Sequence, residues 1–214
     1  MTFSPEIILA STSPRRKEIL SLLGLPFKIV SPRFEENLTE GRSAADEVAS
    51  FAEGKARSVE KAFPQSILIG SDTLIDCQGE KIGKPRDRKD AKAILGRLQG
   101  RPHRIWTAVA LIDPMSASAR VETVEVKIVM REMRSDEIES YVATEEPLDK
   151  AGAYSLQGIG RRFIAKLEGD YLAAVGLPLR PIAGFLNEHG VPVPLDIEQL
   201  YKVKSFLNWK SFDP

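Results

Sequence analysis

Cysteine and histidine are both scarce in this chain of 214 residues. Cys77 is the only cysteine, so an internal disulfide is excluded and a reducing compartment is the simpler setting. Together with His103 and His189, it offers too few ligands for the usual tetrahedral site of a structural zinc ion. We therefore expect a cytoplasmic protein that has no disulfide and no zinc finger.

Long hydrophobic runs are also missing. The longest apolar stretches, residues 7–10 and 108–112, are far shorter than the roughly 20 residues that cross a bilayer. The first residues, MTFSPE, contain no basic segment of the kind that opens a secretion signal. The sequence therefore predicts neither a signal peptide nor a transmembrane helix, and no membrane partner.

An excess of charge of either sign is the third absence. The 30 Lys and Arg residues balance 30 Asp and Glu residues, whereas a general nucleic-acid binder normally carries a basic surplus. Within this overall balance, basic and acidic residues are concentrated in different segments of the chain. Residues 80–104 contain nine basic and three acidic side chains, and residues 121–149 contain three basic and nine acidic ones. A nucleic-acid polymer is excluded as a partner, but a compact anionic ligand is not.

Apolar periodicity and turn residues predict a mixed α/β fold. Strands are expected at residues 7–10, 27–31, 66–70 with a continuation over 72–76, 105–112, 121–130 and 163–167. Helices are expected from Pro14 to just before Gly24, and at 43–61, 87–98, 135–143 and 178–189. Gln78 and Gly79 suit a hairpin turn, and a longer loop should follow Asp113. Crossovers and hairpins together indicate a mixed sheet.

The chain is expected to form one domain of two lobes over residues 1–190. Hydrophobic residues make up 43% of the sequence and charged residues 28%, which is typical of a soluble globular protein. Residues 191–214 contain three prolines and are expected to form a C-terminal extension. We place no chemistry on this extension.

Residues 11–16, STSPRR, connect the first expected strand to the first expected helix. A helix N-terminus presents free backbone N–H groups and a positive dipole end, and Ser11, Arg15 and Arg16 add directed donors. Such a turn suits a polyphosphate, although an ordinary capped helix with surface arginines fits the spacing equally well. No glycine-rich phosphate loop followed by Lys-Ser or Lys-Thr is present, so P-loop chemistry is not supported.

Asp72 and Thr73 follow the apolar run of residues 67–69. Clefts form at strand ends in α/β sheets, and a carboxylate there can bind a metal ion or accept a proton from water. The alternative is a loop aspartate that satisfies backbone N–H groups. Lys84, held between Gly83 and Pro85, is a further candidate cation for a phosphate.

Glu35 and Glu36 follow the second expected strand, where adjacent acids usually form a solvated turn. Beside a polyphosphate they are candidate ligands of a metal ion, because Mg²⁺ prefers carboxylates together with substrate phosphates and water. Lys55 lies on the expected helix 43–61, where a solvated face is the default interpretation.

Residues 146–160 form the densest motif, with small residues interleaved with specific polar groups. Asp149 and Lys150 supply paired charge, and Gln157 can read a base through a donor and an acceptor. A structural turn is the alternative. Gly158 and Gly160 do not complete a dinucleotide-binding fingerprint, because position 163 is Phe.

In this order, the four motifs resemble the Maf family of nucleotide pyrophosphatases over residues 7–190. The resemblance implies hydrolysis of a nucleoside triphosphate between its α and β phosphates, giving a nucleoside monophosphate and pyrophosphate. It also implies a two-lobed α/β fold, shared with the inosine-triphosphate pyrophosphatase type, with the active site in the cleft. Removal of non-standard nucleotides and a link to arrest of cell division are further implications.

The resemblance also implies roles for individual residues. Asp72 matches the family's proton acceptor, and Glu36, favoured over Glu35 by counting from Gly24, would bind Mg²⁺ together with Asp72, with Mn²⁺ as the alternative metal. The positions that set base preference in the family correspond to Arg15, Thr73 and Gln157. The positions that line its substrate site correspond to Ser11, Arg16, Lys55, Lys84 and Lys150.

The branch of the family is indicated by two short segments. The segments Lys150-Ala-Gly and Gln157-Gly resemble the corresponding segments of the branch that prefers dTTP and UTP. The branch that acts on 7-methyl-GTP has Cys-Ala-Gly and Glu-Gly at these places. Hydrolysis of 7-methyl-GTP or modified purines is the alternative activity. A non-catalytic nucleotide-binding regulator of septation is the alternative from another class. The strands over residues 105–130 are a candidate homodimer surface.

Overall fold

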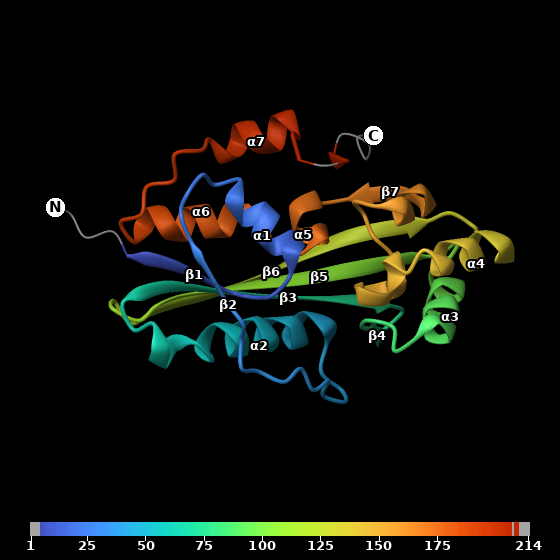
Figure 1. Ribbon diagram of the computed structural model, residues 1–214, viewed down its shortest axis with the longest axis horizontal. Coiled ribbons are helices and arrows are strands. Elements are labelled where there is room, and N and C mark those ends of the chain that lie inside the picture. Colours follow the sequence, from blue (N-terminus) through green and yellow to red (C-terminus); the bar gives the residue numbers. More distant parts are fainter. Residues whose placement is uncertain (1–4, 207, 210–214) are drawn as a thin grey trace.

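The computed structural model describes residues 5–206 and 208–209 of the chain. Its centre is a mixed sheet of seven strands within these residues (Figure 1). The strands are β1 (Glu6–Ala10), β2 (Lys28–Val30), β3 (Ser66–Cys77), β4 (Glu80–Ile82), β5 (Pro102–Asp113), β6 (Ser118–Met130) and β7 (Ile164–Glu168). Their order is β2-β1-β3-β5-β6-β7, and β4 pairs with β3. β1 runs parallel to β2 and β3, and the other pairs are antiparallel, which confirms the predicted mixed sheet.

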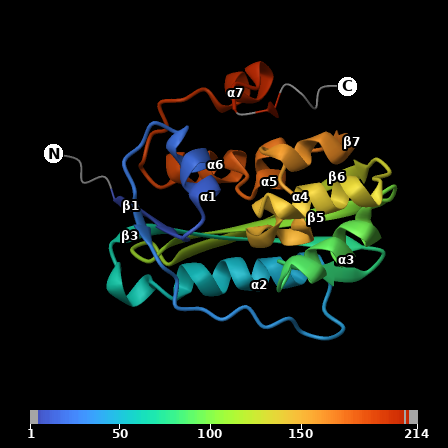
Figure 2. The same ribbon diagram turned by 45° about the vertical axis from the view of Figure 1, so that its right-hand side comes forward.

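Helices cover both faces of the sheet. The α-helices are α1 (Pro14–Ser21), α2 (Ala44–Arg57), α3 (Arg88–Leu98), α4 (Ser135–Ala143), α5 (Tyr171–Val175), α6 (Leu179–Glu188) and α7 (Ile197–Val203). The short 3₁₀ helices include η1 (Glu60–Ala62), η2 (Glu146–Asp149), η3 (Ala151–Ala153) and η4 (Ile159–Phe163). α2 lies on one face, and α1, α5 and α6 lie on the other, with α7 outside α6 (Figures 1 and 2). No helix in the described ranges is long and apolar enough to cross a membrane.

The short first strand shows how the sequence builds two cores. Its apolar run is buried on both faces, as expected for a strand with parallel neighbours. Ile7 and Leu9 pack into the larger core with α1, α5 and α6, whereas Ile8 packs into the smaller core under α2. α2 approaches β3 closely at Gly70, where an added Cβ would lie 2.2 Å from the carbonyl oxygen of Ala52. Glycine at this position therefore sets the distance between helix and sheet.

Several predicted elements have other bounds in the structure, and two of them are instructive. The helix expected over 43–61 ends at Arg57 and is followed by η1. Its start is confirmed, since Ser43 caps the helix by accepting a hydrogen bond from the N–H of Asp46. The prediction of a longer loop after Asp113 is wrong. A short turn follows instead, because β6 begins at Ser118, which pairs with Asp113 of β5. Most residues in the first half of β6 are exposed, so the apolar pattern could not reveal that part of the strand.

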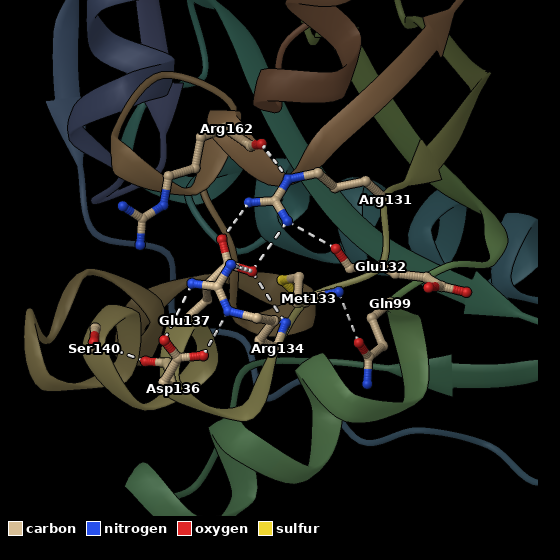
Figure 3. A network of polar contacts seen from close by, with 9 residues as sticks. All are labelled: Gln99, Arg131, Glu132, Met133, Arg134, Asp136, Glu137, Ser140 and Arg162. Atoms are coloured by element: carbon tan, nitrogen blue, oxygen red, sulfur yellow. Dashed lines mark hydrogen bonds and ion pairs between the residues drawn. The ribbon is translucent and has the colours of Figure 1, made fainter.

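A polar network fixes the start of α4 (Figure 3). The guanidinium of Arg131 donates to the Glu137 carboxylate at 2.7 Å and to the carbonyl oxygen of Arg162 at 3.0 Å. The side-chain oxygen of Gln99 accepts from the N–H of Met133 at 2.9 Å. The network ties α4 to the end of α3 and to the segment before β7, and α4 in turn carries residues that support the candidate site.

Candidate active site

All ten residues singled out from the sequence lie around two neighbouring cavities, of about 250 and 280 Å³, that share six lining residues. The first cavity is lined by nine of the ten, namely Arg15, Arg16, Glu36, Lys55, Asp72, Thr73, Lys84, Lys150 and Gln157. Ser11 lines the second cavity. The structure thus brings together α1, α2, β3, the segments that follow β1, β2 and β4, and the region before β7, while the role of each residue stays a prediction.

Lys55, Asp72 and Glu36 form the charged centre of the site. Lys55 comes from α2, Asp72 from the middle of β3, and Glu36 from the segment between β2 and α2. The ammonium nitrogen of Lys55 lies 2.5 Å from Oδ1 of Asp72 and 2.5 Å from Oε1 of Glu36. Lys55 and Asp72 are only 5% and 4% exposed. The default interpretation of Lys55 as part of a solvated helix face is therefore wrong, and Glu36, unlike Glu35, lines the cavity.

Burial and charge act differently on the two carboxylates. Burial raises the pKa of Asp72, and the positive charges of Lys55 and Arg16 offset only part of this effect. Burial opposes ionisation of Glu36 too, but hydrogen bonding and charge from Lys55 outweigh it, so the pKa of Glu36 falls below its ordinary value. Oδ2 of Asp72 is buried and has no hydrogen-bond partner within the described part of the chain. This oxygen is available to a water molecule or a metal ion.

Arg16 connects the first helix to the strands behind it. Its Nε donates to the carbonyl oxygen of Gly176 at 2.9 Å, and its guanidinium donates to the Thr73 hydroxyl at 3.3 Å. Thr73 in turn contacts the hydroxyl of Thr107 at 3.0 Å. Because the Thr107 hydroxyl donates to a carbonyl of α5 at 2.8 Å, the proton between the two threonines comes from Thr73. The alternative of an ordinary capped helix with surface arginines is wrong for Arg16.

The helix that carries Arg15 and Arg16 begins as the sequence predicts, with Ser13 at the N-cap and Pro14 in the first turn. The Ser13 side chain makes no capping hydrogen bond. The N–H of Ser13 instead donates to the hydroxyl of Ser11 at 3.2 Å. Helix dipole, hydroxyl groups and guanidinium groups therefore converge on the second cavity, as an anion site requires.

Gln157 lines the first cavity at the end of a tightly held turn. The hydroxyl of Ser155 accepts from the N–H of Gln157 at 3.2 Å and from the N–H of Gly158 at 3.1 Å. The side-chain nitrogen of Gln157 is buried and has no partner among the described residues. A buried donor without a partner is costly unless a ligand supplies the acceptor, so Gln157 is suited to contact one.

Glu146 and Tyr141 support this turn from behind, and sequence reasoning missed both. The Glu146 carboxylate accepts from the N–H groups of Ile159 and Gly160 at 2.8 and 2.9 Å and from the Tyr141 hydroxyl at 2.8 Å. An added Cβ would lie 2.1 Å from Glu146 at Gly158 and 2.3 Å from the Tyr141 oxygen at Gly160. Gly160, where the added Cβ would also lie 2.8 Å from the backbone nitrogen of Ser155, is therefore required by close packing, and Gly158 leaves room for the Glu146 carboxylate.

The apolar wall of the first cavity was also missed. Its members are Leu74, Ile75, Ile105, Ala151, Tyr154, Leu156, Ala174 and Val175. Tyr154 is fixed by a 2.8 Å hydrogen bond between its hydroxyl and Nε2 of His103. Aliphatic residues of this kind look like ordinary core in a sequence, so only the cavity reveals them.

A second buried ion pair holds the segment that carries Glu36. Glu47 is fully buried on α2, and its carboxylate accepts from the N–H of Thr39 at 2.9 Å and from the Lys81 ammonium at 2.7 Å. The same ammonium donates to the carbonyl oxygens of Thr39 and Arg42. The segment between β2 and α2, which has little secondary structure, is thereby fastened to α2 and β4.

The site offers two carboxylates to a hard divalent cation. No group of three or more His, Cys, Asp or Glu side chains within residues 5–206 and 208–209 could hold a metal ion. Glu36 and Asp72, however, both contact the ammonium group of Lys55, and Oδ2 of Asp72 has no hydrogen-bond partner among the described residues. Mg²⁺ commonly takes one or two carboxylates and completes its shell with phosphates and water. The donor set therefore fits Mg²⁺ bound together with a phosphate ligand.

Residues 6–189 match the model of the family described as Maf-like protein. The chain belongs to the Maf-like protein family. Similar Maf-like relatives are named dTTP/UTP pyrophosphatase in Dictyoglomus turgidum, 46% identical over 86% of this chain and 96% of the relative, and in Moorella thermoacetica, 41% identical over 88% and 97%. The solved Staphylococcus aureus Ham1 protein covers 74% of this chain and 93% of its own, with 18% identity and a TM-score of 0.43, too low for an argument about this Maf-like chain.

Proposed function

We propose that this chain hydrolyses nucleoside triphosphates, with dTTP and UTP preferred, between the α and β phosphates. The observation that carries the proposal is the buried carboxylate of Asp72, whose Oδ2 has no hydrogen-bond partner among the described residues and which lies with the cations Arg16 and Lys55 in one cavity. The names of the similar relatives support the same reaction. The products would be a nucleoside monophosphate and pyrophosphate.

Asp72 is suited to accept the proton of the attacking water. Its raised pKa, caused by burial, brings its basicity closer to neutral pH, where a general base is most effective. Lys55 holds the other oxygen of the carboxylate, so Oδ2 is presented in a fixed position. Arg16 and Lys84, with Arg15 and Lys150, line the same space and would neutralise the phosphates and the leaving pyrophosphate.

Glu36 and Asp72 would hold Mg²⁺, with Mn²⁺ as the alternative. When bound, the metal supplies positive charge to phosphate oxygens. Lys55 contacts both carboxylates and keeps them together before the substrate arrives. Glu36 is more exposed than Asp72, with 51% of its side chain accessible, so it lies at the open side of the pair.

Gln157 and the apolar wall would recognise the base. A uracil or thymine ring presents carbonyl and N–H groups next to one another, and a glutamine amide supplies both a donor and an acceptor. The buried side-chain nitrogen of Gln157, which has no partner in the described part of the chain, would find its acceptor there. Leu74, Ile105 and Leu156 would pack against the ring. Hydrolysis of 7-methyl-GTP or a modified purine is the alternative within the same chemistry.

A substrate panel tests the proposal. Pyrophosphate release is measured with Mg²⁺ for dTTP, UTP, CTP, GTP and 7-methyl-GTP, and we expect dTTP and UTP to be fastest. Asp72→Asn should lower turnover by at least about 10²-fold, since it removes a general base. Flat or purine-biased rates would refute the pyrimidine preference. Nucleotide binding without pyrophosphate release would instead favour a regulator that does not catalyse.

Cellular location and assembly complete the proposal. The scarcity of cysteine supports a cytoplasmic protein. The long β5–β6 hairpin is our candidate homodimer surface, because Val121 and Met115 near its turn are exposed apolar side chains. Light scattering after size-exclusion chromatography would give the mass of the assembly, and a mass near 24 kDa would show a monomer.

A further inference from the structure

We propose that the C-terminal extension positions the Gln157 turn and thereby tunes base selectivity, with Asn208 as the positioning residue. The selectivity part rests on the proposed function of Gln157. The match to the family model ends at residue 189, so the extension lies beyond the family region. It nevertheless reaches the turn that the family region uses to line the cavity.

One hydrogen bond makes the connection. The side-chain amide of Asn208 donates to the backbone carbonyl oxygen of Gln157, across 51 residues of sequence. Asn208 adopts a left-handed backbone with φ of 59°, a conformation that Asn and Asp tolerate better than most residues. The side chain that makes the bond is therefore also one that suits the backbone there.

Aromatic packing anchors the extension near this bond. Trp209 is 5% exposed and stacks on Tyr171, with ring centroids 5.6 Å apart and planes at 18°. Its ring also meets the edge of Tyr201, with centroids 5.0 Å apart. The Tyr201 hydroxyl donates to the Asp170 carboxylate at 2.7 Å. Asn208 is thus presented from a packed cluster rather than from a loose end.

The same anchor reaches the other side of the cavity. Asp170 is the N-cap of α5 and accepts from the N–H groups of Leu172 and Ala173 at 2.8 and 3.2 Å. α5 carries Ala174 and Val175, which belong to the apolar wall. The extension therefore contacts two elements that would enclose the base, the Gln157 turn and the start of α5.

The two sides of the Gln157 turn are held by different parts of the chain. Glu146 and Ser155, both inside the family region, accept from its N–H groups. Asn208, from the extension, donates to the carbonyl of Gln157. Losing this bond frees one face of the peptide that carries the Gln157 side chain. Affinity for the preferred base should fall, while Asp72 and the cations stay in place.

Asn208→Asp is the sharpest test. It keeps the size and backbone preference of Asn but replaces the N–H donor with a carboxylate oxygen that repels the carbonyl. We expect KM for dTTP and UTP to rise about tenfold, as a loss of about 1.4 kcal/mol in binding, with kcat within about twofold. Asn208→Gln keeps an amide donor and should recover part of the loss.

Asn187→Asp is the matched control. The side-chain oxygen of Asn187 accepts from the N–H of Val193 at 2.9 Å, and aspartate can accept in the same way. This substitution adds the same negative charge at the base of the extension, away from Gln157. We expect its kinetics to equal those of the unchanged chain. A tenfold rise in KM here as well would trace the effect to charge and overturn the role of Asn208.

Hydrogen exchange of the amides at residues 157–160 separates positioning from catalysis. We expect these amides to exchange faster in Asn208→Asp than in the unchanged chain or in Asn187→Asp. Unchanged exchange would overturn the positioning role whatever the kinetics show. Faster exchange with unchanged KM for dTTP and UTP would overturn the effect on selectivity. Absence of pyrophosphate release by the unchanged chain would refute the proposed function, and the exchange rates would still decide whether Asn208 holds the turn.

Discussion

Lys55 shows how much depends on one buried side chain. Its ammonium group joins two carboxylates that would otherwise repel each other in a largely buried place. A buried charge is tolerated only when it is paired and hydrogen-bonded, and here one cation serves two acids. The pair of acids and the lysine should therefore be treated as one unit in any substitution experiment.

Lys55→Met removes the cation while keeping most of the side-chain volume. We expect the free energy of unfolding at pH 7 to fall by about 3 kcal/mol, because Asp72 is left buried without its partner. Pyrophosphate release should fall by about 10²-fold or more, as for loss of an electrostatic contact to the reacting group. Urea titration and the release assay measure the two effects. Lys61→Met, at an exposed lysine, is the control, and equal behaviour of the two variants would contradict the argument.

His103 makes stability depend on pH. Burial lowers the pKa of His103 to about 4, against 6.5 when it is exposed. Between these values the unfolded chain binds the proton and the folded chain does not, so the stability contributed by neutral His103 is present above pH 6.5 and is lost as the pH falls toward 4. The full contribution is about 3 kcal/mol.

His103→Gln isolates this contribution, since Gln cannot titrate but retains a donor for Tyr154. Urea titrations at pH 7 and pH 5 should show a larger loss of stability on acidification in the unchanged chain than in the variant. Carboxylates titrate in both proteins, so the difference between them reports His103. Equal losses would show that His103 does not carry the effect.

At the scale of elements, the sequence predicted much of the secondary structure and little of the contacts between segments. The helix over 135–143 has the predicted bounds, because its apolar spacing is regular. Lys55 was expected on a solvated face, since periodicity within α2 does not show that Asp72, 17 residues later, lies beneath it. The candidate site came from the resemblance to a family, whereas the Glu146 support and the apolar wall needed the topology.

The segment between β2 and α2 owes its position to α2. Glu47→Gln removes the charge that binds Lys81 and weakens the hold on Thr39. We expect a loss of about 2 kcal/mol in the free energy of unfolding, as for hydrogen bonds to a charged group. If Glu36 binds Mg²⁺, the concentration of Mg²⁺ for half-maximal pyrophosphate release should also rise. Glu53→Gln, on the exposed side of the same helix, should change neither quantity. Matching results for both variants would refute the role of Glu47.

At the scale of the whole molecule, the basic segment over residues 80–104 and the acidic segment over residues 121–149 partly pair with each other. Arg88, Lys92 and Arg104 of the basic segment pair with Glu145, Glu139 and Glu125 of the acidic one. Exposed pairs of this kind contribute only about 0–1 kcal/mol each. Their effect is instead to neutralise part of the surface along α3, α4 and the β5–β6 pair, while Lys84 of the basic segment lines the cavity.

The C-terminal extension decides whether the chain is one folding unit or a domain with an appendage. The sequence predicts a boundary at residue 190, but Leu200, Tyr201, Phe206 and Trp209 belong to the main hydrophobic core. Each large apolar side chain contributes about 1.5–3 kcal/mol when fully buried. A chain that ends at Gly190 should therefore lose at least about 3 kcal/mol in the free energy of unfolding, measured by urea titration and circular dichroism. Lys202→Ala, at an exposed position of α7, should lose almost nothing. A truncated chain as stable as the full one would instead support residues 1–190 as the complete folding unit.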